Sequence, residues 1–281
     1  MKKKYLFIFL LLIATTLFAQ IDLPRLSPKA SVSQTIGYTV ISIEYSRPGV
    51  KGRKIWGGLV PYNKVWRTGA NESTRIQFTT DVIIEGNKIP AGIYSLYTIP
   101  EENEWTVIIN KALTWGINYF PEQDLLRFKV KPQSAPFTER LLFTIPELTD
   151  SSCSVVMNWE NLQISFNVEV ELTKQVYPKI KEAIANAKED NWQIYVVAAN
   201  YAAEKEVFLD EAFQWIDKAL SMSKNFNCYF TKAKLYARKN NFIEAMKMIE
   251  RCREAGRNDE DFQNRQIEID MFEKQIREKI K

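Results

Sequence analysis

The chain has 281 residues and no histidine, and its 38 basic and 34 acidic residues give a formal net charge of +4. Without histidine, Ser-His-Asp and Cys-His catalysis are excluded, and so is the commonest metal ligand. The three cysteines are scattered and form no Cys-x-x-Cys pair. The composition therefore predicts neither a metal site nor a cofactor.

Residues 1–19 have the three parts of a secretory signal peptide. Lysines at positions 2–4 form a basic start, residues 5–18 are almost wholly apolar, and Ala19 is a small residue at the cleavage position. The apolar run is shorter than the ~20 residues that a membrane-spanning helix needs, so no membrane insertion is expected. We predict an exported protein, periplasmic or extracellular, that is cleaved after Ala19.

Cleavage changes the charge balance. Three of the 38 basic residues and none of the 34 acidic residues lie in this leader, so the remainder carries a net charge of +1. A nearly neutral chain gives no support to a nucleic-acid partner.

From residue 30 to residue 172, apolar residues alternate with polar ones. Alternation of this kind is typical of strands with one face on a core. In Tyr38–Tyr45 the apolar phase slips between Val40 and Ile41, which predicts a bulge or a strand buried on both faces. Gly86-Asn87 predicts a tight hairpin turn. We predict an antiparallel β-sandwich of roughly eight or nine strands over residues 20–172.

After residue 173 the pattern becomes helical, and residues 190–256 resemble tetratricopeptide repeats. Corresponding residues recur 33 or 34 positions apart: Tyr195, Ala199 and Ala202 as Tyr229, Ala233 and Tyr236, and Ala212, Ile216 and Ala219 as Ala245, Ile249 and Cys252. Ala202 stands where that family usually has an aromatic residue, and the closing proline is missing. We predict a helical domain over residues 173–281, with a lead-in helix at Lys174–Lys188 and a polar capping helix at Asp261–Lys281.

The cysteines allow one pairing within the helical half. Cys228 and Cys252 both lie there, whereas Cys153 lies far away in the sequence. A disulfide between the first two is one interpretation in an oxidising compartment. The interpretation that we favour is three buried thiols.

Several long motifs of the first half resemble one family of exported bacterial proteins. They include Tyr45-Ser-Arg-Pro-Gly-Val-Lys-Gly-Arg53, Val65-Trp-Arg-Thr-Gly-Ala-Asn-Glu72 and Ala91-Gly-Ile-Tyr-Ser-Leu-Tyr-Thr-Ile-Pro100. Together they are similar to the family called domain of unknown function 2911, found mostly in Bacteroidetes, over residues 27–172. Asn63 departs from the family pattern, because a glycine is expected at this position. The resemblance implies an exported β domain and brings no established reaction, cofactor or catalytic residue.

The stretch from Val65 to Ser73 raises the question of what Arg67 pairs with. We expect Trp66 to be an anchor in the core, because an indole buries a large apolar area. An arginine without a partner is costly to bury. The interpretation that we favour is a structural lock in which Arg67 pairs with Glu72, and Asn71 bonds to nearby backbone. Glu44 is the other candidate partner.

The alternative is that Arg67 binds a ligand. Residues 44–75 hold seven basic residues and only two acidic ones, and arginine forks bind carboxylates, phosphates and sugar acids. A solvated basic loop is the simpler interpretation. Trp115, on another loop, either stacks on a sugar or, as we favour, plugs the end of the sandwich. The candidate binding residues are Arg47, Lys51, Arg53, Arg67, Asn71, Glu72 and Trp115.

Three functions remain open. The leading one is a non-enzymatic, exported binding protein, with a small acidic or sugar ligand on the β domain and a protein partner on the helical repeats. The second is a carbohydrate hydrolase with Glu44 and Glu72 as its carboxylate pair. The third is a purely architectural envelope module. We predict no catalytic residue from the sequence.

Overall fold

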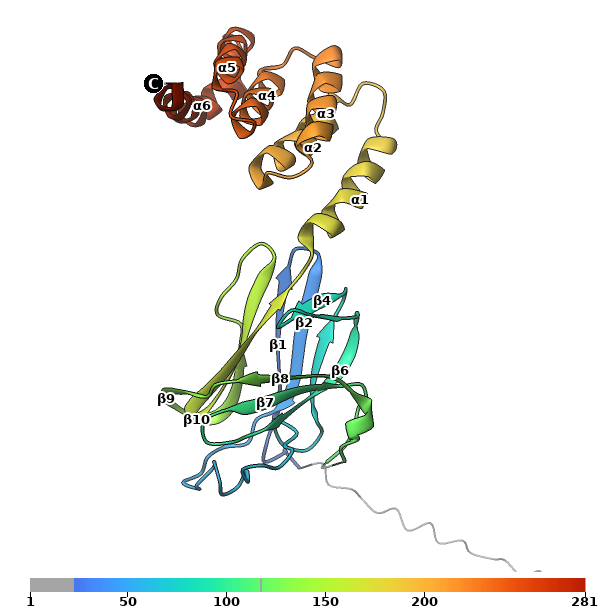
Figure 1. The fold of residues 1–281 in the computed structure, drawn as a ribbon, viewed down its shortest axis with the longest axis vertical. Helices are drawn as coiled ribbons and strands as arrows, with labels where there is room; N and C mark the ends of the chain where they lie inside the picture. Colours follow the sequence, from blue (N-terminus) through green and yellow to red (C-terminus); the bar gives the residue numbers. More distant parts are fainter. Residues whose placement is uncertain (1–22, 117, 281) are drawn as a thin grey trace, which may run out of the picture. The chain divides into compact units, whose positions relative to one another are not determined.

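A computed structural model describes residues 23–116 and 118–280. The chain divides into two compact units, one of strands that ends at Val168 and one of helices that begins at Glu169 and includes Ile36–Tyr38 (Figure 1). The predicted leader and its cleavage site lie outside the described residues. In residues 23–116 and 118–280 no helix has both the length and the apolar character that crossing a membrane requires.

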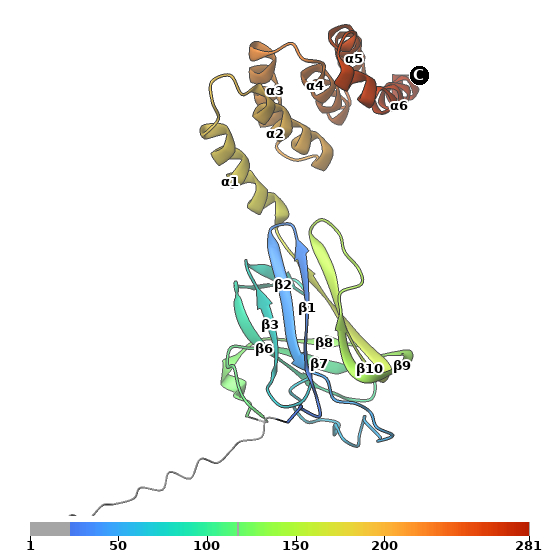
Figure 2. The ribbon, with the colours of Figure 1, turned by 180° about the vertical axis from the view of Figure 1, so that it is seen from behind.

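The first unit contains two sheets. Within its described residues, one sheet has six strands in the order β1-β2-β3-β6-β7-β8 (Figure 2). The other sheet has four strands in the order β5-β4-β10-β9. The strands are β1 (Lys29–Ile36), β2 (Thr39–Ser46), β3 (Thr74–Phe78), β4 (Val82–Ile84), β5 (Asn87–Ile89), β6 (Gly92–Ile99), β7 (Trp105–Asn110), β8 (Asp124–Val130), β9 (Gln133–Thr144) and β10 (Ser152–Glu169). The pairings of β2 with β3, β3 with β6, β6 with β7 and β9 with β10 are antiparallel.

Aromatic pairs join the two sheets. Tyr45 of β2 meets Phe143 of β9 edge to face with ring centroids 4.8 Å apart, and Phe128 of β8 meets Phe166 of β10 at 5.5 Å. Such pairs add about 0.5–1.5 kcal/mol each beyond the area that they bury. The core of this unit therefore lies between the sheets.

The prediction of a bulge or a doubly buried strand near Val40 is wrong. In β2 the side chains of Thr39, Ile41, Ile43 and Tyr45 are buried, and the pairing with β3 runs without a shift. Thr39 occupies the first buried position, so the strand keeps one phase throughout. Val40 lies on the opposite, half-buried face.

The predicted hairpin is confirmed, one residue earlier than expected. Ile84 pairs with Asn87, so the two turn residues are Glu85 and Gly86, with φ angles of +46° and +77°. Two consecutive residues with positive φ suit the twist of a two-residue hairpin, and glycine adopts this conformation without a steric penalty.

The second unit contains six helices within its described residues. They are α1 (Leu172–Ala185), α2 (Trp192–Lys205), α3 (Leu209–Met222), α4 (Phe226–Arg238), α5 (Phe242–Gly256) and α6 (Glu260–Ile280). The side chains of Asn191, Asn225 and Asn241 cap the first turns of α2, α4 and α5 by accepting backbone hydrogen bonds. A strand-rich unit followed by helices is thus confirmed.

Small residues of the recurring pattern are buried where helices pack. Ala199, Ala212 and Ala219 lie in one helical core, and Ala233 and Ala245 lie in the next. The three cysteines are free and buried, which confirms the interpretation of three thiols. Burial raises the pKa of the Cys252 thiol to about 12, so this thiol is unreactive at neutral pH.

We expect residues 20–172 to fold without the helices. This fragment keeps all ten described strands and the apolar core between the two sheets. Its far-ultraviolet circular dichroism should show β structure, and its thermal melt should be cooperative. A disordered fragment, expressed beside a folded chain of residues 20–281, would show that the helices complete its core.

Candidate functional site

Four tryptophans form one cluster in the β unit, with Trp105 coming from β7 of one sheet and Trp159 from β10 of the other. Trp66 stacks on Trp159 with ring centroids 5.7 Å apart and 17° between the planes, and Trp56 meets Trp105 edge to face at 4.7 Å. Trp56, Trp105 and Trp159 are buried, whereas Trp66 is only half-buried. Trp66 therefore packs in the cluster, as expected of an anchor, but it is not fully buried and also lines a hollow.

Hydrogen bonds of backbone, hydroxyl and indole groups hold the loop around Trp66. The backbone N–H of Trp66 donates to the Thr98 carbonyl at 2.7 Å, and that of Thr98 donates back to the Trp66 carbonyl at 2.9 Å. The Thr74 hydroxyl donates to the Thr68 carbonyl at 2.8 Å, and the Trp66 indole N–H donates to the Gly69 carbonyl at 3.1 Å. Arg67 is thus presented from a fixed backbone.

The predicted lock between Arg67 and Glu72 is wrong. Glu72 accepts two hydrogen bonds from Nη1 of Arg25, at 2.8 and 2.9 Å, and Lys29 lies 3.6 Å away. The bond from Arg25 is the main reason why the pKa of Glu72 is lowered. Arg25 belongs to the segment before β1. The sequence around Glu72 does not indicate that this distant segment supplies its partner.

Asn71 fastens the same segment. Its Nδ2 donates to the Ser27 carbonyl and to the Ser46 hydroxyl, both at 3.2 Å. The predicted bond from Asn71 to backbone exists, but its acceptor lies 44 residues away in the sequence. Asn71 and Glu72 therefore hold the N-terminal segment in place.

Arg67 makes no ion pair with any carboxylate in the described part of the chain. Its side chain is half-buried, and its Nε is buried without an acceptor there. Burial lowers the pKa of Arg67, and no neighbouring acid opposes that shift. A partly desolvated cation without a counter-charge is unfavourable, so the free protein gains little stability from Arg67.

Arg67 lines a hollow of about 300 Å³, which we call the Arg67 hollow. Small-molecule sites typically measure ~300–1,000 Å³, so this one suits a small ligand. Its lining includes three cations and no acidic side chain. The residues around it are Leu26, Ser27, Pro48, Gly49, Lys51, Arg53, Leu59, Val60, Trp66, Arg67, Gly69, Ala70 and Trp159.

Two predicted residues join Arg67 there. Arg53 is held by its own loop, because its Nε donates to the Val50 carbonyl at 3.1 Å and its Nη2 to the Gly49 carbonyl at 2.6 Å. The backbone N–H of Lys51 donates to Glu139 at 3.1 Å, and Lys51 is an exposed residue of the lining. The structure thus brings together Lys51, Arg53 and Arg67.

The other predicted residues lie outside this hollow. Nε of Arg47 donates to the Leu141 carbonyl at 2.8 Å, which ties β2 to β9. Trp115 is 57% exposed and pairs through its backbone with Glu72, so the interpretation of Trp115 as a plug is wrong. Sequence reasoning missed Trp159, because it approaches Trp66 from a strand 93 residues further along.

Glu44 and Glu72 line a separate hollow of about 30 Å³, together with Lys29 and Arg75. A water molecule needs roughly 10–15 Å³ of such space, so the hollow has room for about two or three waters and none for a sugar ring. This geometry gives no support to a carboxylate pair that acts on carbohydrate.

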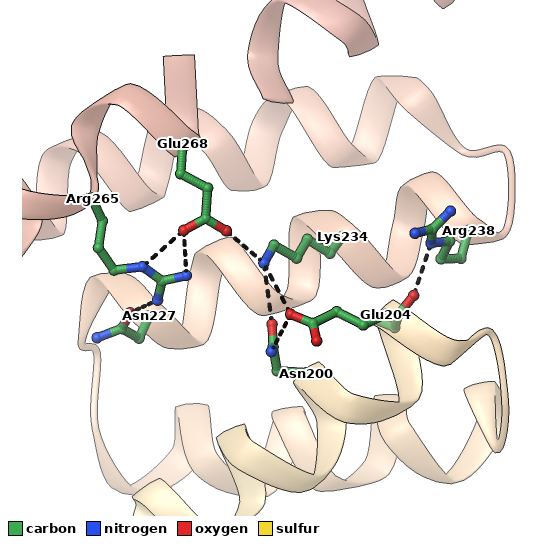
Figure 3. Close-up of polar contacts among 8 residues, drawn as sticks. Asn200, Glu204, Asn227, Lys234, Arg238, Arg265 and Glu268 are labelled. Carbon is green, nitrogen blue, oxygen red and sulfur yellow. Dashed lines mark hydrogen bonds and ion pairs between the residues drawn. The ribbon is translucent and has the colours of Figure 1, made fainter. Parts of the chain in front are cut away.

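A polar bridge crosses the groove between α2, α4 and α6 of the helical unit (Figure 3). Nζ of Lys234, whose side chain is 13% exposed, lies 2.9 Å from Glu268 and 3.2 Å from the Asn200 side-chain oxygen. Arg265 bonds to the other oxygen of Glu268 at 2.8 Å. Hollows of about 500 and 510 Å³ border this bridge, and Glu204 lines both.

We expect this bridge to make the helical unit sensitive to acid. Burial by itself would raise the pKa of Glu268. Hydrogen bonds from Lys234 and Arg265 lower this pKa by more than burial raises it, so the pKa of Glu268 lies below the usual 4.5. A lowered pKa contributes stability above the unfolded-state pKa, and this contribution is lost as pH falls through the folded-state pKa. The loss should therefore begin near pH 4.5, and urea melts followed by circular dichroism should show it.

Glu268→Gln should flatten this dependence, because the amide does not titrate. Glu250→Gln, at an exposed position of α5, is the matched control and should leave the dependence intact. Identical acid profiles for the two variants would exclude Glu268 as the titrating group.

One known protein family matches the β unit, which contains the Arg67 hollow. The family model described as protein of unknown function (DUF2911) matches residues 27–168. The helices lie outside this match, and no curated protein and no solved structure gives a significant match. The match spans half of the sequence and nearly all of the strands. The chain belongs to this family of proteins of unknown function, DUF2911.

Proposed function

We propose that the protein is an exported, non-enzymatic binding protein whose β unit holds a small anionic ligand in the Arg67 hollow. The observation that carries the proposal is Arg67 itself, a half-buried cation on a rigid loop without a carboxylate partner in the described chain. A bound anion supplies the missing counter-charge. The free-energy cost of a half-buried charge without a counter-charge is tolerated at sites where function depends on that charge.

The lining of the hollow supports a ligand with an acidic group and an apolar or ring-shaped body. A guanidinium binds carboxylate or phosphate through two parallel hydrogen bonds, and Lys51 and Arg53 add two more positive charges to the lining. The half-buried Trp66 offers aromatic surface beside these charges, and the buried Trp159 stacks on it. Sugar acids, sugar phosphates and small carboxylates share these features.

The same observations rank the alternatives. Acid–base catalysis by paired carboxylates has no place in the hollow, since no acidic side chain lines it. A purely architectural role gives no reason for an unpaired arginine at the wall of a hollow. Binding accounts for both features.

We expect Arg67→Met to abolish binding while leaving the fold intact. Titration of residues 20–281 with glucuronate and with glucose phosphate, followed by tryptophan fluorescence, should show saturation that the variant loses. Its urea midpoint should stay the same or rise, because the arginine is unpaired in the free protein.

Lys131→Met is the matched control, because it removes one positive charge from an exposed turn of the same unit. It should keep the affinity of the unsubstituted protein. Binding that survives Arg67→Met, or a marked loss of stability in that variant, would contradict a ligand role for Arg67.

We also propose that the helical unit is a tetratricopeptide-like platform for a protein partner. The observation that favours it is the groove between α2, α4 and α6, where Trp192 and Tyr201 line one hollow and Phe242 and Phe272 line the other. Hollows of this size accept side chains of a bound segment. Val197 is exposed and lines the same hollow as Trp192. The test is whether Val197→Asp weakens binding of a partner whose binding site has been mapped to this groove.

A further inference from the structure

A second hollow adjoins the Arg67 hollow. It measures about 180 Å³, and its lining includes Leu59, Val60, Lys64, Trp66 and Arg67. Both hollows share the side chains of Leu59, Val60, Trp66 and Arg67. Arg67 is thus the one charged residue that borders both spaces.

The second hollow repeats the charge pattern of the first. Lys64 is exposed at its rim and forms no ion pair with the carboxylates of the described chain, and no acidic side chain lines the space. Taken together, the two linings carry Lys51, Arg53, Lys64 and Arg67. One carboxylate would balance only one of these four charges.

The residues that line both hollows are apolar except for Arg67. A ligand that occupied both spaces would lie against the shared residues Leu59, Val60 and Trp66. The guanidinium has five N–H donors in a planar fork, so it can donate toward both sides of such a ligand.

Resting on the proposed anion-binding function, we infer that the ligand is an organic dianion with its two acidic groups separated by an apolar body. One acidic group lies in the Arg67 hollow beside Lys51 and Arg53. The other lies in the adjoining hollow beside Lys64, and Arg67 contacts both. The shared chemistry is two anionic groups, supplied by either a dicarboxylate or a bisphosphate.

The test compares dianions with monoanions of the same body on residues 20–281. Linear dicarboxylates from succinate to suberate are titrated beside monocarboxylates of equal length, with adipate and hexanoate as the central pair. Fructose bisphosphate and fructose monophosphate form the phosphate arm. Tryptophan fluorescence and calorimetry report the dissociation constants.

We expect the best dianion to bind at least about tenfold more tightly than its monoanion. Lys64→Met should remove about threefold or more of that preference, in keeping with an exposed charge, and should leave the monoanion unaffected. Lys54→Met removes a charge from the same loop but lines neither hollow, so it should leave the preference intact. Lys64→Gln and thermal melts check that the loop still folds.

The outcomes separate the two proposals. Equal affinity for dianion and monoanion, or equal effects of Lys64→Met and Lys54→Met, would overturn the two-part ligand while Arg67-dependent binding of single anions stands. Absence of Arg67-dependent binding in both arms would overturn the anion site itself.

Discussion

Replacing Trp105 with alanine is expected to lower the free energy of unfolding of the β unit by about 3–5 kcal/mol. Trp105 is fully buried on β7, and its ring meets Trp56 edge to face at 4.7 Å and Trp66 at 6.5 Å. Alanine would leave a cavity where the sheets meet, and it would remove two aromatic pairs worth about 0.5–1.5 kcal/mol each within that total.

Trp115→Ala is the matched control for Trp105→Ala. Trp115 is 57% exposed, so the same substitution there should change stability by less than about 0.5 kcal/mol. Urea unfolding of residues 20–281, followed by tryptophan fluorescence and circular dichroism, measures both variants. Similar losses for the two would mean that the four-tryptophan cluster does not hold the sheets together.

Local periodicity was sufficient to predict most of the fold. Alternation predicts strands because side chains point to opposite faces, and Ile164, Phe166 and Val168 are indeed buried on β10. The recurring alanines predicted close helix packing, and Ala199 and Ala233 are fully buried. The slip at Val40 misled because Thr39, a polar residue, fills a buried position.

The candidate site was only partly predictable, because its partners come from distant segments. The basic character of residues 44–75 indicated an anion site, and Lys51, Arg53 and Arg67 line one hollow. The choice of Glu72 as the partner of Arg67 failed because sequence proximity says little about which way a side chain turns. Positive φ at Thr68 and Asn71 bends the loop, and Glu72 meets Arg25 instead.

Gly256→Ala is expected to destabilise the helical unit by about 1–3 kcal/mol, the usual cost of overpacking. A Cβ at this position would lie 2.1 Å from Cδ2 of Phe262, a ring that is 8% exposed and packs edge to face on Phe226. Glycine is needed here for space, since the ring of Phe262 at the start of α6 covers the last residue of α5. Alanine's higher helix propensity, worth at most ~1 kcal/mol, offsets only part of this cost.

A double-mutant cycle with Phe262→Leu isolates that clash. Leucine has no ring to meet the new Cβ, so Gly256→Ala should cost much less in the Phe262→Leu background than in the unsubstituted chain. Urea melts followed by helical circular dichroism should give a coupling above roughly 0.5 kcal/mol, with the double variant more stable than the sum of the single losses predicts. Additive losses would show that a glycine is needed at position 256 for its backbone conformation and not for the space that the ring of Phe262 occupies.

The same displacement is expected to reach the polar bridge, because α6 carries both Phe262 and Glu268, the partner of Lys234. Gly256→Ala should therefore also lose part of the acid sensitivity of the polar bridge.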